Sequence, residues 1–460
     1  MLPDVALLRI FEIYIMMDEY QIEAWRSLVH VCRQWRSIVF GSPRRLNLRL
    51  LCTIRTPIKE KLNVFPPLPI VVSASRRIHN VITALEHNDR VCDLEISRLS
   101  SSEEEKLFAV MQRPFSALTN LYLRLEGGKI PDSFMGGSAP RLQKFWSQRL
   151  RFPGLPNLLS SATHLIHLTL YEMPSPGRFG YIPSETMLTG LSTLTRLEKL
   201  EIGFEYLTDT NRPVRKSLHS APLTRTVFPV LTRFRFNGFN EYLEDLVDQI
   251  AVPSLDNLHI SFFYQPTFDT PQLTRLISDT PKINTHSRAR VSFSVGWVKW
   301  ETLLTLDGGL SLGVSGGNGS PQQVSYLMQV CRSCLPQALI PAVEDLYIPR
   351  GYMPYELRED AFERGDWLEF LHPFTAVKRL YISWQFAPYI APALQEIVGE
   401  GVTVVLPALQ DLFFEETDTL KDSVKVAIVQ IIAARRLAGH PVTHPDNVDE
   451  WWELETGVQI

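Results

Sequence analysis

The residues that come closest to a reactive or metal-binding arrangement are Cys331 and Cys334, which are separated by two positions. This spacing is half of a structural zinc site, but such a site needs four ligands, and no second cysteine pair or His-x-x-x-His lies nearby. Three positions apart on a helix, both thiols would face one core. We therefore expect two buried cysteines and no metal. His440 and His444, in the run His-Pro-Val-Thr-His-Pro, are more typical of a turn than of metal ligands.

A glycine-rich stretch at 308–319 is the second candidate for chemistry, because glycine-rich loops can hold phosphate groups. It contains no lysine that could reach a phosphate, and the chain has no Gly-x-x-x-x-Gly-Lys-Ser/Thr motif. A His-Glu-x-x-His motif is also absent. We therefore interpret this stretch as a flexible loop and expect a protein that is not an enzyme and needs no cofactor.

The N-terminal stretch 2–38 is the part of the chain to which we assign the function. Leu7, Ile10, Phe11 and Tyr14 recur at helical spacing, and further apolar residues extend this stripe around most of the helix. A helix that is apolar nearly all round must be buried on more than one side. About 40 residues cannot bury that much surface alone, so this segment needs either the rest of the chain or a second protein.

A second amphipathic helix follows, with Trp25 and Val29 on one face. Three short motifs in the stretch, Leu2-Pro3, Ile10-Phe11 and the closing Val31-Cys32-Arg33-x-Trp35-Arg36, resemble the F-box pattern. The resemblance covers about a tenth of the chain, and the closing hexad is its specific part.

The F-box resemblance implies a helical module that docks on a Skp-type adaptor, which in turn holds a cullin ubiquitin ligase. The residues it assigns to the adaptor contact are Leu2, Pro3, Leu7, Ile10, Phe11, Val31, Cys32 and Trp35. The alternative from the residues alone is an ordinary pair of amphipathic helices that covers the end of the next domain.

Downstream of residue 90 the chain repeats the phrase apolar-x-x-apolar-x-apolar. Central positions recur mostly at intervals of 24 to 34 residues, with weaker copies expected near Phe145, Val291 and Leu310. Nine copies are clear, and their first residues are Val91, Leu118, Leu165, Leu197, Leu231, Leu255, Val343, Val377 and Leu409. Each copy predicts a short strand, a turn and a returning helix, a unit too small to bury its own apolar face, so the copies must stack.

The array resembles a leucine-rich-repeat solenoid. The predicted fold class is therefore α/β: an N-terminal F-box helical module, then an irregular solenoid with a parallel sheet, then a C-terminal capping helix. Because the turn asparagine of such repeats is mostly absent, we expect inserted loops at 127–137, 174–183, 208–226 and 307–320. The predicted divisions are 1–45 for the helical module, 46–90 for a connector and the N-terminal part of the array, 91–416 for the solenoid, 417–440 for the capping helix and 441–460 for an acidic, tryptophan-containing tail.

The residue between the last two apolar positions of each copy should point away from the core, outward on the open face of the sheet that lines the inside of the arc. Aromatic and basic residues at such positions are typical of protein interfaces, so we expect a target protein to bind at Tyr347, Tyr381, Phe413, His259 and Arg235. The alternative is that exposed strand positions favour aromatics by propensity alone.

Composition limits the class of partner and the compartment. A net charge of -4 and an isoelectric point near 6.3 provide no basic field for nucleic acid. No secretory signal or membrane-spanning run is visible, and five cysteines indicate a reducing compartment, so we expect a cytoplasmic or nuclear protein. The working hypothesis is a substrate receptor of a Skp–cullin–F-box ligase; the alternative is a repeat scaffold without ligase association.

Overall fold

The computed structural model divides into two compact units, unit 1 (Met1–Glu205 with Thr226–Leu231) and unit 2 (Tyr206–Arg225 with Thr232–Ile460). The structure describes residues 2–17, 22–56, 58–206, 225–265, 267–284, 286–295, 299–317, 323–351, 364–383, 385–395, 405–415, 422–437 and 441–443. The predicted tail from 444 onward, with His444, and most of the expected loop at 208–226 lie outside these residues, as does His440.

Unit 1 begins with three helices, α1 (Asp4–Met16), α2 (Trp25–Val29) and α3 (Arg33–Gly41). Helix α1 starts directly after Pro3, whose extended backbone suits the position before a helix. The buried side chains Phe11, Trp25 and Val39 belong to one cluster with Leu48 and Leu50, which lie in and before the first strand. The helical module and the first strand therefore share a hydrophobic core.

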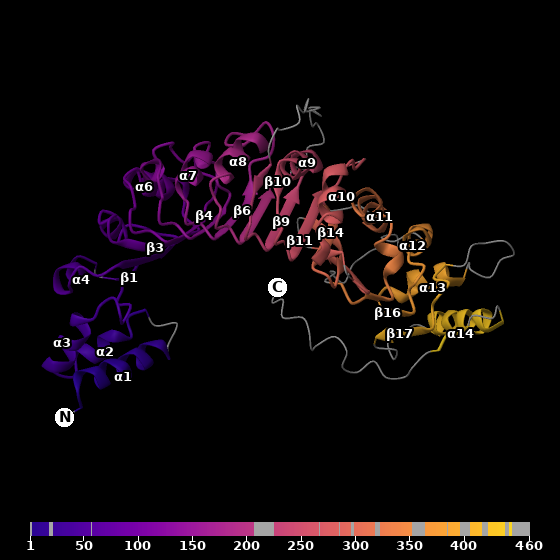
Figure 1. The fold of residues 1–460 in the computed structure, drawn as a ribbon, viewed down its shortest axis with the longest axis horizontal. Coiled ribbons are helices and arrows are strands. Elements are labelled where there is room, and N and C mark those ends of the chain that lie inside the picture. The colour runs from indigo at the N-terminus through magenta and orange to yellow at the C-terminus, as the bar shows by residue number, and fades with distance from the viewer. Residues whose placement is uncertain are drawn as a thin grey trace. The chain divides into compact units, whose positions relative to one another are not determined.

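The rest of unit 1 is a series of parallel strands that pair in chain order. The strands are β1 (Leu50–Thr53), β2 (Ile70–Ser75), β3 (Val91–Ser97), β4 (Asn120–Arg124), β5 (Lys144–Gln148), β6 (His167–Met173) and β7 (Lys199–Phe204), with the short β8 at Thr226–Val227. The helices are α4 (Ile58–Val64), α5 (Ile82–Leu85), α6 (Ser101–Val110), α7 (Leu155–Ser161) and α8 (Ser184–Leu191), with a 3₁₀-helix at Phe134–Gly137. The helices that connect successive strands lie along one face of the strand series (Figure 1).

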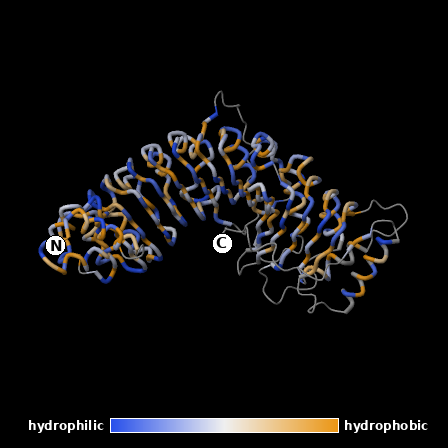
Figure 2. Tube along the Cα trace, turned by 60° about the horizontal axis from the view of Figure 1, so that its bottom comes forward, coloured by the Kyte–Doolittle hydropathy of each residue, from blue (hydrophilic) through white to orange (hydrophobic). Residues whose placement is uncertain are grey.

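The repeated apolar phrase sets the register of this sheet. The buried residues Leu94, Leu121, Phe145, Leu168 and Leu200 are direct partners on successive strands. The weak copy near Phe145 is thus a true strand of the series. Hydrophobic and hydrophilic residues alternate along the strands (Figure 2), as expected when one face packs on helices and the other does not.

Unit 2 continues the pattern with one interruption. Its strands are β9 (Arg233–Gly238), β10 (Ile250–Ala251), β11 (Asn257–Phe263), β12 (Arg288–Val295), β13 (Lys299–Leu306), β14 (Leu310–Gly317), β15 (Asp345–Ile348), β16 (Arg379–Ser383) and β17 (Asp411–Glu415). The order is β9-β11-β14-β13-β12-β15-β16-β17, and β13 alone of these runs antiparallel to its neighbours. The α/β class and the mostly parallel sheet predicted from the sequence are confirmed.

Each helix of unit 2 except the last, α14, lies in the chain between two strands. The helices are α9 (Asn240–Asp248), α10 (Pro271–Ser278), α11 (Gln323–Cys334), α12 (Arg364–Leu371), α13 (Ala387–Gln395) and α14 (Asp422–Leu437), with 3₁₀-helices at Pro281–Ile283 and Ile340–Ala342. Helix α14 occupies most of the segment expected to cap the array, and Arg435 and Arg436 lie in its last turn.

The glycine-rich stretch corrects a prediction, because it forms strand β14 and not a flexible loop. A Cβ atom at Gly316 would lie 2.7 Å from the Trp300 indole, and one at Gly313 would lie 2.4 Å from the carbonyl oxygen of Thr302. Both contacts come from the antiparallel neighbour β13. The glycines are therefore required for close approach of two strands.

Candidate functional site

The first candidate surface is the outward face of α1. Leu2, Ile10, Ile13 and Met17 are 55%, 47%, 50% and 82% exposed. Ile10 and Ile13 lie within α1, about 60° apart around it at 100° per residue, while Leu2 precedes the helix and Met17 is its C-cap. Val31, in the turn before α3, is also exposed, and Gln34 near the start of α3 donates to the Asp4 carboxylate at 2.9 Å. Exposed apolar side chains grouped on one module make this a candidate surface for a partner.

The inward face of α1 contains two residues, Leu7 and Phe11, that were predicted to contact the adaptor, and their burial corrects that prediction. Leu7 and Phe11 are buried in the core of unit 1, and the Phe11 ring lies 4.7 Å from the Trp35 ring, which is half-buried. In this structure Phe11 is fully buried and Leu7 is only 6% exposed, so neither can contribute much surface to a partner. Periodicity grouped them with Ile10 and Tyr14 because α1 is apolar nearly all round, so spacing alone could not tell which side faces the core.

The remaining predicted contact residues lie at the surface. Leu2, Pro3, Ile10, Val31 and Cys32 are all exposed. The Cys32 sulfur accepts a hydrogen bond from the backbone N–H of Trp35 at 3.5 Å, so this side chain occupies the N-cap position of α3. The structure thus brings the F-box-like motifs together on one module but divides their residues between its core and its surface.

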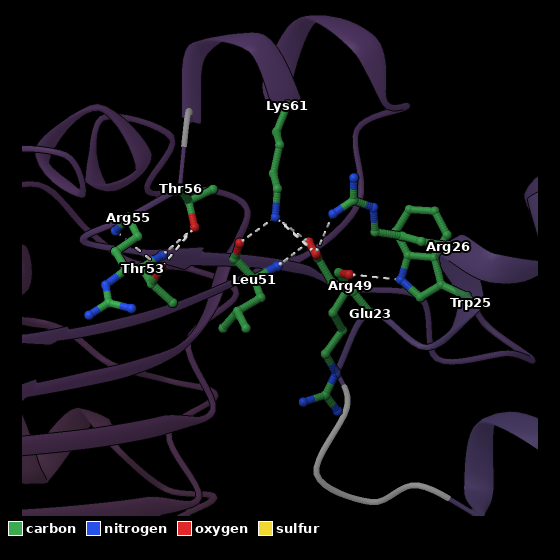
Figure 3. A network of polar contacts seen from close by, with 9 residues as sticks. All are labelled: Glu23, Trp25, Arg26, Arg49, Leu51, Thr53, Arg55, Thr56 and Lys61. Carbon is green, nitrogen blue, oxygen red and sulfur yellow. Dashed lines mark hydrogen bonds and ion pairs between the residues drawn. The ribbon is translucent and has the colours of Figure 1, made fainter. Parts of the chain in front are cut away.

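A polar network joins α2 to the edge strand β1 (Figure 3). The Lys61 ammonium donates to both oxygens of Glu23, at 2.8 and 2.9 Å, and to the carbonyl of Leu51 at 3.0 Å. The N–H of Leu51 donates to Glu23 at 2.9 Å, and the Trp25 indole N–H donates to the carbonyl of Arg49 at 3.0 Å. Side chains of and beside the helical module therefore satisfy backbone groups that an edge strand would otherwise leave open.

Sequence reasoning missed Glu23 and Lys61, since a single acid and a single base carry no periodic signal. Their side chains are only 15% and 13% exposed. The carboxylate also accepts from the Arg26 guanidinium at 3.1 Å. The network fixes the helical module against the first strand of the array.

Replacing Lys61 with methionine is expected to lower the free energy of unfolding of unit 1 by about 2 kcal/mol, because the largely buried Glu23 carboxylate loses the less exposed of its two cations and the Leu51 carbonyl loses a donor. Urea unfolding followed by circular dichroism measures the change. Arg9→Met is the matched control: it removes an ion pair to Glu12 in which the arginine is 71% exposed, and we expect no measurable change. Equal effects of the two substitutions would contradict this role of the network.

The second candidate surface is an aromatic stack on the outward face of unit 2. Tyr347, Tyr381 and Phe413 are direct partners on β15, β16 and β17. Their rings are parallel within 6° and 4°, with centroids 4.2 and 4.3 Å apart. Burial raises the pKa of the Tyr347 and Tyr381 hydroxyls above the ordinary value.

Beside the stack, a carboxylate is held between two arginines. Asp345 accepts from the Arg379 guanidinium, with an Oδ2 contact of 2.7 Å, and lies 3.7 Å from Arg288. The Asp345 hydrogen bond raises the pKa of Arg379. This arrangement holds both arginines along the strands at the base of the aromatic stack.

The other two predicted target-binding residues occupy neighbouring strands at the opposite end of unit 2. Arg235 on β9 and His259 on β11 are direct register partners. They continue in one row through Ser311, Thr305 and Arg290 to Tyr347. All five candidate residues therefore lie on one row of outward positions, in two groups.

Unit 1 contains a stack that sequence reasoning did not assign. The rings of Tyr122 and Trp146 lie 4.0 Å apart at 5°, and Trp146 contacts Tyr171 at 6.0 Å. The Tyr171 hydroxyl donates to Glu201 at 2.5 Å. Trp146 was missed because it belongs to the weak copy around Phe145, where the repeated phrase is incomplete.

The two cysteines of α11 and the serine Ser311 are the residues to consider for metal binding or catalysis. Cys331 and Cys334 are buried on α11, and burial raises the pKa of both thiols, that of Cys334 to about 12. Ser311 lies in a run that matches Gly-x-Ser-x-Gly, a motif whose catalytic serine stands at a strand-to-helix turn. Here Ser311 lies within strand β14, and its hydroxyl donates a hydrogen bond to the Thr305 hydroxyl at 3.1 Å. Within the described ranges, no group of three or more His, Cys, Asp or Glu side chains could hold a metal.

Comparison with known proteins gives little. Neither a protein-family model nor a curated protein matches the chain. Among solved structures it is similar to a leucine-rich repeat-containing protein, LegL7, from Legionella pneumophila, with 11% sequence identity and a TM-score of 0.27 over 86% of this chain and 98% of that one. In the part of the chain that is described, no helix has both the length and the apolar character needed to cross a bilayer.

Proposed function

We propose that this chain is the substrate-recognition subunit of a Skp–cullin–F-box ubiquitin ligase. The N-terminal module docks on the Skp-type adaptor, and the leucine-rich-repeat-like array holds a target protein. The chain is not an enzyme: it contributes proximity, raising the effective concentration of target lysines near the conjugating enzyme.

The observation that carries the proposal is the outward stripe of α1. The module buries Phe11 and Trp25 completely within unit 1, yet Ile10, Ile13 and Met17 remain exposed on the same helix. An apolar face that remains exposed in the described part of the chain is the feature expected of a subunit whose partner covers it. The F-box-like motifs name that partner as a Skp-type adaptor.

The N-terminal module is also attached to the first strand of the array by packing and hydrogen bonds. Its core extends into Leu48 and Leu50, and Glu23 and Lys61 connect it to β1. An adaptor bound to the outward face of α1 would therefore hold unit 1 in a defined orientation.

Binding of purified adaptor to the full chain tests the proposal directly. We expect a one-to-one complex by isothermal titration calorimetry, and co-purification of the adaptor and a cullin from cells whose proteasome is blocked. Absence of both interactions would reject the ligase assignment.

The alternative is a repeat scaffold whose helical module serves only to cover the edge of the sheet. The side-chain hydrogen bonds to the backbone of Leu51 and Arg49 favour it. This function would leave the chain without affinity for the adaptor, while removal of the Lys61 contacts would still destabilise unit 1.

A further inference from the structure

The outward row of unit 2 has two chemically different ends. Register pairs place Arg235, His259, Ser311, Thr305, Arg290, Tyr347, Tyr381 and Phe413 on successive strands. The first strands provide cationic and hydrogen-bonding side chains, and the last three provide stacked aromatic rings. A partner that covers the row must therefore match both ends.

Within unit 2, the strands that follow β9 in the sheet place no carboxylate beside its arginines. The outward positions of β9, β11 and the start of β14 are occupied by Arg233, Arg235, Asn237, Asn257, His259, Ser261, Ser311 and Gly313. None of these residues is acidic. At the aromatic end, in contrast, Arg288 and Arg379 both face Asp345.

Two guanidinium groups on one strand favour an anionic partner. Arg233 is exposed and Arg235 half-buried, and they are two residues apart, so both project from the same face of β9. Guanidinium groups bind carboxylates through paired N–H donors, and such charge-assisted bonds are the strong ones at an interface. Charge complementarity therefore indicates a carboxylate at this end.

The distance between the two ends sets the length of the partner. From β9 to β15 the row crosses five strand intervals of about 4.8 Å, or about 24 Å in all. An extended peptide advances about 3.3 Å per residue, so about seven residues cover this distance. An extended segment can satisfy both ends at once.

We infer that the outward face of unit 2 binds an extended acidic segment of a target protein, with Asp or Glu side chains at Arg233 and Arg235 and an apolar side chain about seven residues away at the Tyr347–Tyr381–Phe413 stack. This inference rests on the proposed function and specifies the class of target. The aromatic edges supply apolar contact area, and the arginines supply orientation.

Selection of displayed random peptides on the immobilised full chain tests the inference. We expect enrichment of peptides in which acidic residues and a large apolar residue are about seven positions apart. A selected peptide, labelled with fluorescein, should lose about tenfold or more in affinity when Arg233 and Arg235 are both replaced by glutamine, with a similar loss for Tyr381→Ala. Fluorescence anisotropy measures the dissociation constants.

The control is Arg275→Gln, which removes one exposed positive charge on α10 of the same unit and should leave peptide affinity unchanged. Selected peptides without an acidic excess, or acidic peptides that bind the Arg233→Gln, Arg235→Gln chain normally, would overturn the inference. Complete displacement of the peptides by a single-stranded oligonucleotide that binds more tightly would also overturn it in favour of nucleic acid. Adaptor binding should be unaffected by these variants, which separates this test from that of the proposed function.

Discussion

Replacing Phe11 with alanine is expected to lower the free energy of unfolding of unit 1 by about 3–5 kcal/mol, the range for a large side chain removed from a packed core. Phe11 is fully buried and contacts the Trp35 ring at 4.7 Å. The cavity would lie in the cluster that joins α1 to Trp25 and Leu48, so neither side of the module can close it by a simple shift. A lower urea midpoint at unchanged slope is the measurement.

Val5→Ala serves as the control, because Val5 belongs to the same helix but is 73% exposed. A surface substitution of this kind should change stability by less than about 0.5 kcal/mol. A small effect of Phe11→Ala, equal to that of Val5→Ala, would mean that α1 does not pack on the first strand in solution.

These two residues also show what the sequence could predict about the helical module. The apolar residues of 2–38 predicted helices that need a partner, and they also predicted that 40 residues could not bury their own surface. They could not predict which face of α1 is inward, since Phe11 and Ile10 are equally hydrophobic and differ by 100° around the helix. Only the positions of Trp25, Leu48 and Leu50 decide it.

In the array, local pattern determined the register but not the connections. The phrase, with its weak copy at Phe145, placed Leu94, Leu121, Phe145, Leu168 and Leu200 correctly on successive strands, because buried central positions must align when parallel strands stack. The antiparallel β13 was not predicted. Its pairing with β14 depends on Gly313 and Gly316, and glycines alone do not distinguish a loop from a strand that another backbone approaches closely.

Some residues of the candidate functional site could be predicted from the repeated phrase, and others could not. Tyr347, Tyr381 and Phe413 were predicted from their place in the phrase, and the register stacks them. Glu23 and Lys61 could not be predicted, because their partners are 28 and 10 residues away along the chain at the backbone of Leu51. Contacts of that kind depend on tertiary structure and leave no periodic trace in a single sequence.

The double substitution Ile10→Asp with Ile13→Asp is expected to reduce adaptor affinity by about a hundredfold or more, because truncating or charging central apolar residues of an interface typically removes 2 kcal/mol or more each. Both side chains are about half exposed and point away from the core, so the module should stay folded. Calorimetric titration with purified adaptor measures the loss, and an unchanged urea midpoint shows that it is not caused by unfolding.

The chain offers a matched control in Val426→Asp with Val429→Asp, which changes two exposed apolar residues at the same spacing on α14. Because the proposed adaptor surface is confined to the N-terminal module, this variant should bind the adaptor as the wild type does. Equal loss in both variants would indicate a general effect of added negative charge. Full binding by the Ile10→Asp, Ile13→Asp chain would exclude the outward face of α1 as the docking surface, even if the adaptor binds elsewhere.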